Sequence, residues 1–433
     1  MIKNIFIIFI ILLLNNCSFD TRSGIWTEEP ISLSNEENKK IQELFKNEIL
    51  DENEFNPNLK IDIKNLDDNK NKIKGNNFGA SKVSSIFKNV SNYKFNKIKY
   101  FNQFEPEAIF INKDLIFFNK KGSIIKFDDK SNIKWKVNHY SKKEKKLLPL
   151  LRFAKSGTKL LVTDNFAKIY LVDTSNGDLI WKVDHTVSLI SQIKVDEDKF
   201  YVLDANNIFS CFSLLDGQKV WQFKTEKKLI NSQKQTSVII NEESVIFNNT
   251  RGEIISLDKL NGNLNWITPT IEYGESFQSF LVKNSDLVLN NDNIYFSNNK
   301  NSFFSLDVNL GFINWKQNIS SYLRPIIIDN IILTISPTGY LYILEKNSGN
   351  IIRVTDIFYN LKTRKRNKIE ISGFISTNDK IYLSTNNGKI IKINIKDGNL
   401  DLIYKISRNK ISKPYVNNSK LYIIKDNGII KIN

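Results

Sequence analysis

An all-β fold made of repeated small sheets is the fold class that this sequence predicts. From about residue 108, a short frame of an acidic residue, a glycine and a tryptophan returns at spacings of 38 to 49 residues. Val, Ile, Leu, Phe and Tyr occur in short bursts, which favour strands over amphipathic helices. A period of this length is typical of architectures in which small units pack against one another.

The copies differ in how completely they keep the frame. Three are complete: Asp173, Gly177 and Trp181; Asp258, Gly262 and Trp266; Asp307, Gly311 and Trp315. Two are nearly complete: Asp128 and Trp135 with Asn132 at the glycine position, and Gly217 and Trp221 with Ser213 at the acidic position. Three have decayed: Glu345, Gly349 and Arg353; Asn394, Gly398 and Leu402; and a last copy that begins at Asn427 and reaches the acidic position at Asn433.

Each part of the frame has a physical reason. The alternating apolar run before the acidic residue predicts a strand with one buried face. The acidic side chain, or Asn or Ser in its place, bonds backbone amides and opens a tight turn in which glycine supplies a positive φ. The tryptophan starts the next strand and offers a large flat surface to a neighbouring sheet.

A four-stranded sheet of this kind cannot bury both faces alone, but radially stacked copies can. The eight frames therefore predict an eight-bladed β-propeller of four-stranded antiparallel blades over residues 76–433, with seven blades as the alternative count. Because the eighth frame lacks its tryptophan strand, another strand must complete that blade. The extended stretch Tyr93–Phe101 is the candidate, and its pairing with the C-terminal strand would close the ring and remove two exposed edges.

The first residues have the pattern of a secretory signal, with Lys3 before the apolar run Ile5–Leu14. Ten residues are too few for a membrane span, which needs about 20. The sequence Leu14-Asn15-Asn16-Cys17 resembles a bacterial lipobox, which implies a lipoprotein signal peptide over 1–16 and Cys17 as the lipid attachment residue, with palmitate expected. Ser18, by resemblance to lipoprotein sorting, implies an outer-membrane anchor facing the periplasm. The alternative is a cleaved signal with an incidental cysteine.

Residues 17–75 predict a polar tether with a short helix over 34–50. Ser34 and Glu37 have the spacing of a capping box. The apolar residues behind them share one helical face: Ile41, Leu44, Phe45 and Ile49. Such a helix would dock on the propeller rim, form only transiently in solution or bind a partner, and the sequence does not decide among these interpretations.

The formal net charge is +16, but only 8 of the 62 basic residues are arginine. Because proteins that read nucleic acids rely on the planar arginine fork, the lysine excess favours compositional drift at the surface over an anionic partner, and no nucleic acid partner is predicted. One dense basic run, Lys362–Lys368, includes Arg364, Lys365 and Arg366. It predicts a solvated loop between blades, with contact to acidic lipid or lipopolysaccharide as the alternative.

The remaining candidates for chemistry are few. Cys211 lies in the apolar stretch 208–212 and predicts a buried, inert thiol. His139 and His185 follow Trp135 and Trp181 at equivalent places, which predicts a shared packing or surface role rather than a metal site. The sequence contains neither a glycine-rich phosphate loop nor a Gly-x-Ser-x-Gly elbow. No catalytic residue, metal or cofactor is therefore predicted.

The frame Asp-x-x-x-Gly-x-x-x-Trp resembles the tryptophan-docking repeat of quinoprotein-type propellers over about residues 95–433. Two groups share that repeat, so the fold does not settle function. The pyrroloquinoline-quinone (PQQ) dehydrogenases imply Ca²⁺ ligands, an aspartate base and commonly a vicinal disulfide. This chain has no Cys-Cys pair, and its acidic residues lie mostly at turn positions such as Asp173 and Asp258.

The second group is the BamB family of outer-membrane lipoproteins, which the chain resembles in its lipobox, its tether and its single eight-bladed domain. The resemblance implies a non-catalytic scaffold that works as a monomer within the β-barrel assembly machinery and binds its inserting subunit, BamA, and other subunits. In the family, a Leu-x-Leu-Arg stretch after the third tryptophan strand docks BamA. Lys228–Ser232 corresponds to it, with Leu229 as the candidate and no arginine. The alternatives are a lipoprotein propeller that binds a glycan or envelope polymer and, more distantly, a degenerate PQQ-dependent dehydrogenase.

Overall fold

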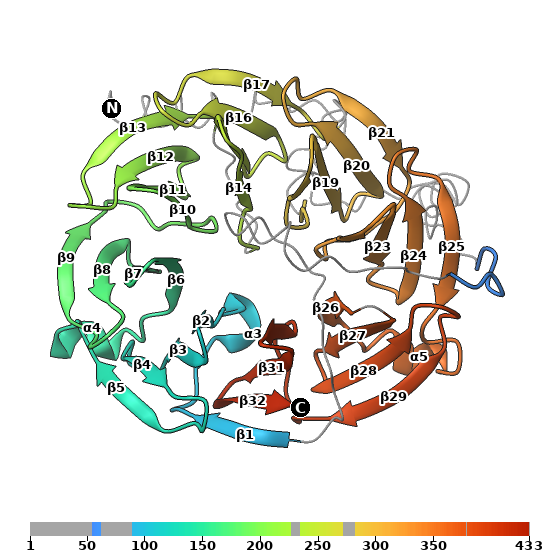
Figure 1. Ribbon diagram of the computed structural model, residues 1–433, viewed down its shortest axis with the longest axis horizontal. Helices are drawn as coiled ribbons and strands as arrows, with labels where there is room; N and C mark the ends of the chain where they lie inside the picture. The colour runs from blue at the N-terminus through green and yellow to red at the C-terminus, as the bar shows by residue number, and fades with distance from the viewer. Residues whose placement is uncertain (1–53, 62–88, 227–233, 272–281, 378, 433) are drawn as a thin grey trace, which may run out of the picture. The chain divides into compact units, whose positions relative to one another are not determined.

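Eight four-stranded antiparallel sheets follow one another around a ring (Figure 1). The structure is a computed structural model, and it describes residues 54–61, 89–226, 234–271, 282–377 and 379–432. The fold is an eight-bladed β-propeller, which confirms the predicted fold class and the count of eight blades.

In blades 1 to 7, four consecutive strands run from the centre of the ring to its outer edge (Figure 1). Blade 1 consists of β2 (Ile109–Ile111), β3 (Asp114–Phe118), β4 (Ile124–Phe127) and β5 (Ile133–Val137), and blade 2 of β6 (Leu151–Ser156), β7 (Lys159–Asp164), β8 (Lys168–Asp173) and β9 (Leu179–Asp184). Blade 3 consists of β10 (Lys194–Asp196), β11 (Lys199–Leu203), β12 (Ile208–Ser213) and β13 (Lys219–Lys224), and blade 4 of β14 (Val238–Ile240), β15 (Ser244–Asn248), β16 (Ile254–Asp258) and β17 (Leu264–Thr268). Blade 5 consists of β18 (Val288–Asn290), β19 (Asn293–Asn298), β20 (Ser302–Asp307) and β21 (Ile313–Gln317), and blade 6 of β22 (Ile326–Ile328), β23 (Ile331–Ile335), β24 (Tyr340–Glu345) and β25 (Ile351–Asp356). Blade 7 consists of β26 (Ile371–Ser376), β27 (Lys380–Thr385), β28 (Lys389–Asn394) and β29 (Leu400–Lys405).

Blade 8 joins strands from distant parts of the sequence. Its inner strands are β30 (Tyr415–Asn417), β31 (Lys420–Lys425) and β32 (Gly428–Ile432), and its outer strand is β1 (Asn89–Lys94). Tyr93 lies opposite Ile429, and Lys94 lies opposite Gly428. An N-terminal strand therefore closes the ring, which confirms the predicted closure.

The predicted bounds of the closing strand, 93–101, were wrong. The strand ends at Lys94 because its partner β32 begins at Gly428, opposite that residue. The next amides follow the turn before β32 instead, since Phe95 donates to the Asn427 carbonyl and Ile98 to that of Asp426. The chain then enters a short helix, α3 (Phe101–Phe104).

Two further short helices lie in connections that lead from one blade to the next. α4 (Lys142–Lys146) lies between blades 1 and 2, and α5 (Thr363–Arg366) lies between blades 6 and 7. The hydroxyl of Ser141 accepts the Glu144 amide, and the Glu144 carboxylate accepts the Ser141 amide, so a complete capping box begins α4.

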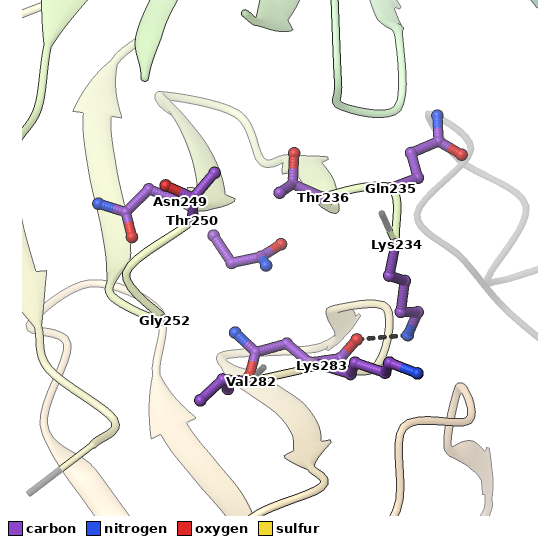
Figure 2. A pocket seen from close by; sticks show the side chains of 10 residues that line it. Lys234, Gln235, Thr236, Asn249, Thr250, Gly252, Val282 and Lys283 are labelled. Atoms are coloured by element: carbon purple, nitrogen blue, oxygen red, sulfur yellow. Dashed lines mark hydrogen bonds between the residues drawn. The ribbon is translucent and has the colours of Figure 1, made fainter. Parts of the chain in front are cut away.

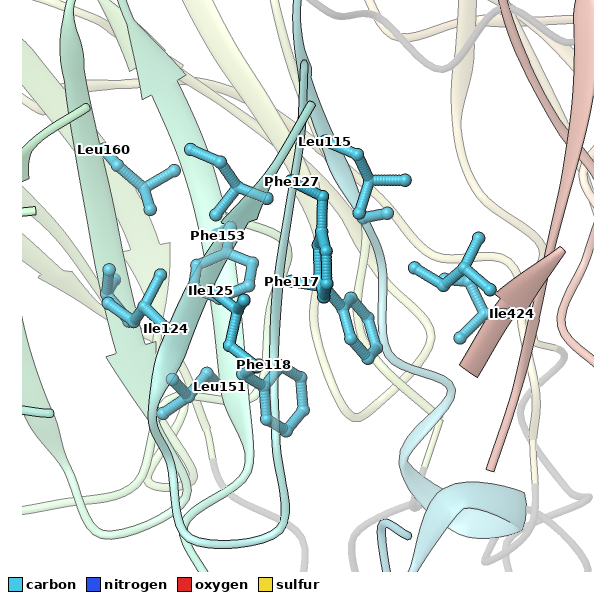
Figure 3. Packing of buried hydrophobic residues seen from close by; sticks show 14 of the residues in the cluster. Leu115, Phe117, Phe118, Ile124, Ile125, Phe127, Leu151, Phe153, Leu160 and Ile424 are labelled. Atoms are coloured by element: carbon cyan, nitrogen blue, oxygen red, sulfur yellow. The ribbon is translucent and has the colours of Figure 1, made fainter. Parts of the chain in front are cut away.

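The core lies between the blades. All of β15 and all of β16 except Asp258 are buried, so both faces of these strands are covered. The alternating pattern alone predicted one buried face, but both are buried because each blade has a neighbour on either side, as radial stacking of the copies predicts. Figure 3 shows the arrangement at blade 1, where Phe117 of β3 and Phe127 of β4 belong to a cluster that also holds Phe153 of blade 2 and Ile424 of blade 8.

Part of the segment interpreted as a tether lies against blade 6. Phe55 forms an antiparallel bridge with Val354 of β25, and the Ile61 amide donates to the Lys396 carbonyl at 2.9 Å. Residues 54–61 thus contact the outer strand of one blade and the frame turn of the next. The predicted helix over 34–50 lies outside the described residues, and the limits of signal, tether and propeller stay predictions.

Candidate functional site

The frame tryptophans connect each of the first five blades to the next blade. Every indole N–H donates to the carbonyl of the residue that follows the acidic position in the next frame. The pairs are Trp135 with Thr174 (3.2 Å), Trp181 with Leu214 (3.0 Å), Trp221 with Lys259 (3.3 Å), Trp266 with Val308 (3.1 Å) and Trp315 with Lys346 (3.1 Å). The same five tryptophans therefore act as hydrogen-bond donors across five blade interfaces.

The frame glycine of the following blade lies against the same indole. Gly311 has a φ of +72°, and a Cβ at this position would lie 2.5 Å from the Trp266 ring. A side chain is thus excluded by both backbone conformation and space. The same contact recurs between Gly177 and Trp135, Gly217 and Trp181, Gly262 and Trp221, and Gly349 and Trp315.

The acidic frame residues hold the turn between the third and fourth strands. Asp258 accepts the amides of Leu260 (2.8 Å) and Asn261 (3.0 Å) through one carboxylate oxygen. Asp128, Asp173 and Asp307 make equivalent bonds to the amides of their own turns. The hydrogen bond from the Asn132 side chain lowers the pKa of Asp128, and the one from the Ser175 hydroxyl lowers that of Asp173. These carboxylates are engaged in local turn structure.

Arg353 takes the place of tryptophan in blade 6, and its side chain is fully buried. One guanidinium nitrogen donates to the Ile395 carbonyl at 2.6 Å, which is the acceptor position used in the other blades. The second nitrogen donates to the carbonyls of Lys396 (2.7 Å) and Leu59 (2.9 Å). The arginine therefore joins blade 6 to blade 7 and also holds the segment 54–61.

The ring-closing interface uses other donors for the same acceptor position. Lys431 of β32 donates to the Asp129 carbonyl at 2.8 Å and contacts its carboxylate at 2.6 Å. Tyr93 of β1 donates to the same carbonyl at 3.4 Å. In blade 7 the tryptophan position of the frame holds Leu402, whose side chain has no polar hydrogen to donate. Sequence reasoning placed Arg353 in the frame but missed its bonds. An arginine at a tryptophan position was the available signal.

Two of the predicted site residues, Cys17 and Leu229, lie outside the described residues. Cys211 is buried in β12, and burial raises the pKa of its thiol to about 12. The two histidines make similar contacts in successive interfaces. The His139 ring packs edge-on against Tyr170 of the next blade, with 5.7 Å between ring centroids. The His185 ring packs in the same way against Phe212, at 5.9 Å. Burial also lowers the pKa of His139.

The basic run 362–368 is more than a solvated loop. Arg366 in α5 forms an ion pair with Asp356 at 2.7 Å and donates to the Thr338 carbonyl at 2.9 Å. Its guanidinium also lies over the Tyr340 ring. The prediction of a solvated loop therefore fails for this arginine, because one turn of helix brings it against blade 6.

A cluster of charged side chains gathers where the chain enters the inner strands, and sequence reasoning did not find it. We call it the channel cluster. Its members come from seven blades: Glu107, Arg152, Lys194, Lys234, Asp286, Arg324 and Lys413. Their charges interact, because the charges of Glu107, Asp286, Arg324 and Lys413 all change the pKa of Lys194. Successive members are 38 to 89 positions apart in sequence, so only the closed ring brings them to one place.

Two hollows open beside the channel cluster. One has a cavity volume of about 60 Å³ and is lined by residues of blades 1 to 4, among them Glu105, Glu107, Arg152 and Lys194. The other, with a cavity volume of about 20 Å³, is lined by residues of blades 4 and 5, among them Lys234 and Lys283 (Figure 2). Lys234 donates to the carbonyls of Asn284 and Tyr322, the latter at 2.6 Å.

Burial sets the ionisation of the channel cluster. It lowers the pKa of Lys194 and of Lys234 to about 8 and that of Arg152 to about 10. Burial disfavours the charged form of Glu107, but Lys413, whose Nζ lies 2.5 Å from the carboxylate, lowers the pKa below its usual value. Burial thus weakens the charged form of the two lysines and the arginine, whereas an ion pair keeps Glu107 charged.

Comparison with known proteins decides the family. A family model described as outer membrane protein assembly factor BamB matches residues 120–355, more than half of the chain. This chain belongs to the BamB family. The resemblance seen in the sequence is thereby confirmed.

Solved structures show the same fold at low sequence identity. BamB from Moraxella catarrhalis superposes with a TM-score of 0.66 at 14% identity, covering 80% of this chain and 100% of that one. The computationally designed Ika8 protein reaches 0.60 at 9% identity, covering 79% and 99%. Quinohemoprotein alcohol dehydrogenase from Comamonas testosteroni reaches 0.57 at 8% identity, covering 81% and 76%. A search of curated proteins found no match.

The match to the BamB family covers the frame residues that donate across the first six blade interfaces. It includes all five frame tryptophans and Arg353, and it ends just inside the last residues of β25. Within the described residues of this BamB-family chain, no helix is long and apolar enough to cross a membrane.

Proposed function

We propose that this chain is a non-catalytic scaffold lipoprotein of the outer-membrane β-barrel assembly machinery, held to the outer membrane by acylated Cys17 and facing the periplasm. In this role it binds BamA and aids the insertion of β-barrel proteins. The observation that carries the proposal is the BamB family match over residues 120–355, on a closed ring of eight blades. The lipobox-like sequence before Cys17 supports the anchor.

The use of the frame carboxylates supports a scaffold rather than an enzyme. Asp128, Asp173, Asp258 and Asp307 bond the amides of their own turns, so a structural role accounts for them. The propeller fold is also that of a quinohemoprotein alcohol dehydrogenase, and fold alone therefore does not separate the two functions. The family match favours the scaffold.

Co-purification with BamA tests the partner. Envelopes are extracted with a mild detergent, and the tagged full-length chain is recovered with its bound proteins. We expect BamA with the wild-type chain, less BamA with Leu229→Glu, and wild-type recovery with Leu402→Glu, which places the same charge on the exposed outer strand β29. Recovery of no barrel-assembly subunit with the wild-type chain would overturn the proposal.

The two cysteines make a matched test of the anchor. Metabolic labelling with palmitate should label the wild-type chain but not Cys17→Ala. The Cys211→Ala variant should be labelled as the wild-type chain is, because the Cys211 thiol that it removes is buried. Cys17→Ala should also leave the membrane fraction. Labelling that persists in Cys17→Ala would contradict lipid attachment at this residue.

A further inference from the structure

Four apolar side chains lie exposed on the frame turns of three consecutive blades. Leu215 of blade 3, Leu260 of blade 4, and Leu310 and Phe312 of blade 5 are each between 63% and 69% exposed. The three blades follow one another around the ring (Figure 1). Large apolar side chains that gather at the surface of neighbouring elements are typical of interaction sites, because their contact with water costs free energy.

The matching turns of blades 1, 2, 6 and 7 are polar at the position of Leu215 and Leu260, two residues after the acidic position of the frame. The residues there are Lys130, Ser175, Asn347 and Lys396. The turn itself does not require leucine, since Asp173 accepts the Ser175 amide just as Asp258 accepts the Leu260 amide. The exposed leucines of blades 3 and 4 therefore have no explanation in the turn chemistry.

Acidic side chains accompany these apolar residues. In an antiparallel blade, the turn between the first two strands and the turn between the last two lie at the same edge. We call these two turns of blades 3, 4 and 5, with the strand residues that border them, the turn surface. It holds nine acidic residues and three lysines, which gives each of the three blades a net charge of −2. In the other blades the same count lies between −1 and +1.

Two of the three lysines pair within the turn surface, and their charges are already included in that count. Lys259 of blade 4 pairs with Asp196 of blade 3 at 2.9 Å, so the turns of these blades lie against each other. Lys199 pairs with Asp198 at 3.4 Å. The turn surface is thus negative on a chain whose net charge is +16. A partner that complements it is both basic and apolar.

Blade 7 shows what a frame turn can hold. The Ile61 amide donates to the carbonyl of Lys396, the residue at the position of Leu215 and Leu260, at 2.9 Å. The Ile61 side chain also packs against the apolar cluster of blades 6 and 7. A segment of polypeptide from outside the blade therefore fits against a turn of this type.

We propose that the turn surface of blades 3 to 5 binds a segment of a partner protein in which basic and apolar residues lie close together. The apolar residues of the segment cover the exposed leucines and Phe312, and its cations face the surrounding carboxylates. A bilayer that contains anionic lipid fits less well, because its charge has the same sign as the turn surface. The turn surface does not include Leu229, so the inference does not depend on binding to BamA.

Fluorescence anisotropy with defined peptides tests the turn surface. The purified full-length chain is titrated into three labelled octapeptides, which alternate lysine with leucine, glutamate with leucine, or lysine with serine. We expect saturable binding of the lysine–leucine peptide alone, weakened by added salt. Because the whole chain is positive, general charge attraction would favour the glutamate–leucine peptide instead. Equal or tighter binding of that peptide would overturn the proposal.

Matched substitutions locate the bound peptide. Leu260→Ser should weaken binding of the lysine–leucine peptide by about tenfold, because an apolar contact is lost, and Glu243→Gln should weaken it by about threefold. Leu400→Ser and Asp379→Asn remove the same kinds of exposed side chain from blade 7 and should bind as the wild-type chain does. Unfolding midpoints check that each variant folds. Unchanged binding in Leu260→Ser, or equal weakening in Leu400→Ser, would contradict the assignment.

Two further measurements test other occupants of the turn surface. Flotation with vesicles of phosphatidylcholine and phosphatidylglycerol uses the chain with Cys17→Ala, so that the anchor does not contribute. Analytical ultracentrifugation measures self-association of the same chain. Vesicle binding that is lost in Leu260→Ser would assign the surface to a bilayer, and self-association that is lost in Leu260→Ser would assign it to a second copy. Either result would overturn the proposal.

Discussion

Blades 1 to 5 and blade 6 solve the same interface problem with different side chains. In the first five, an indole N–H reaches the carbonyl that follows the next frame's acidic position, and the ring covers the frame glycine. In blade 6, Arg353 reaches the equivalent carbonyl of Ile395 and also those of Lys396 and Leu59. The acceptor is constant and the donor varies, because a buried carbonyl needs a hydrogen bond from whichever group can supply it.

The difference has a structural consequence. An indole has one N–H and can serve one acceptor, whereas a guanidinium has five and can serve several. Blade 6 therefore joins its neighbour and also holds residues 54–61, which come from far earlier in the chain. A tryptophan frame repeats a local contact, and an arginine at the same position adds a long-range one.

The largest effect is expected from removing the guanidinium. Arg353→Met should lower the free energy of unfolding by about 3–5 kcal/mol, because the buried carbonyl of Ile395 and the partly buried carbonyls of Lys396 and Leu59 lose a charged donor. Urea unfolding measures the change, and hydrogen exchange at the Ile61 amide reports whether the segment 54–61 is released. Arg353→Lys, which keeps the charge with fewer donors, should lose less. A cost for Arg353→Met below about 1 kcal/mol would remove the distinction between blade 6 and the others.

The next effect concerns the glycine under an indole. Gly311→Ala should cost about 2–4 kcal/mol, because its Cβ would meet the Trp266 ring in a left-handed backbone conformation. Gly157 is the matched control: its φ is +54°, but a Cβ there would meet nothing within 4 Å. Gly157→Ala should therefore cost only the backbone strain, about 1–2 kcal/mol. Equal costs for the two variants in thermal or urea unfolding would show that the indole contact contributes little.

A smaller effect is expected from the indole N–H itself. Trp266→Phe should cost about 1–3 kcal/mol, because the buried carbonyl of Val308 loses its donor and some ring area is lost. Trp315→Phe removes an N–H with the same 3.1 Å donor–acceptor distance and should cost a similar amount. Unfolding free energies of the two variants compare blades 4 and 5 directly. Unequal costs would indicate that the repeated contacts are not equivalent.

The smallest effect is a pH dependence in the connection after blade 1. The hydrogen bond from Lys168, at 2.8 Å, and those from Ser141 lower the pKa of Glu144 to about 2. Because the folded pKa lies below the unfolded one, the stabilisation is present above about pH 4.5 and is lost as pH falls toward 2. Glu144→Gln should flatten this part of the pH profile by less than about 1 kcal/mol. Melting temperatures of wild type and variant across this pH range test it, and parallel profiles would contradict it.

Much of the fold could be predicted from local patterns. The acidic residue, the glycine and the tryptophan each serve a turn or strand start within a few residues, so their spacing revealed eight blades even where the frame had decayed to Glu345, Gly349 and Arg353. The closing strand was expected but misplaced, because the end of β1 is set by Gly428, more than 300 positions away in sequence. No local signal in residues 89–101 marks that end.

Sequence alone determined that this chain forms a ring of eight sheets, since each frame encodes its own turn chemistry. The tertiary structure decided which contacts cross between blades and which charges meet at the centre. Lys194, Glu107 and Lys413 look like ordinary surface residues in sequence. They meet because ring closure brings together residues at or just before the inner strands of different blades, and their burial is a property of that shared space rather than of any one segment.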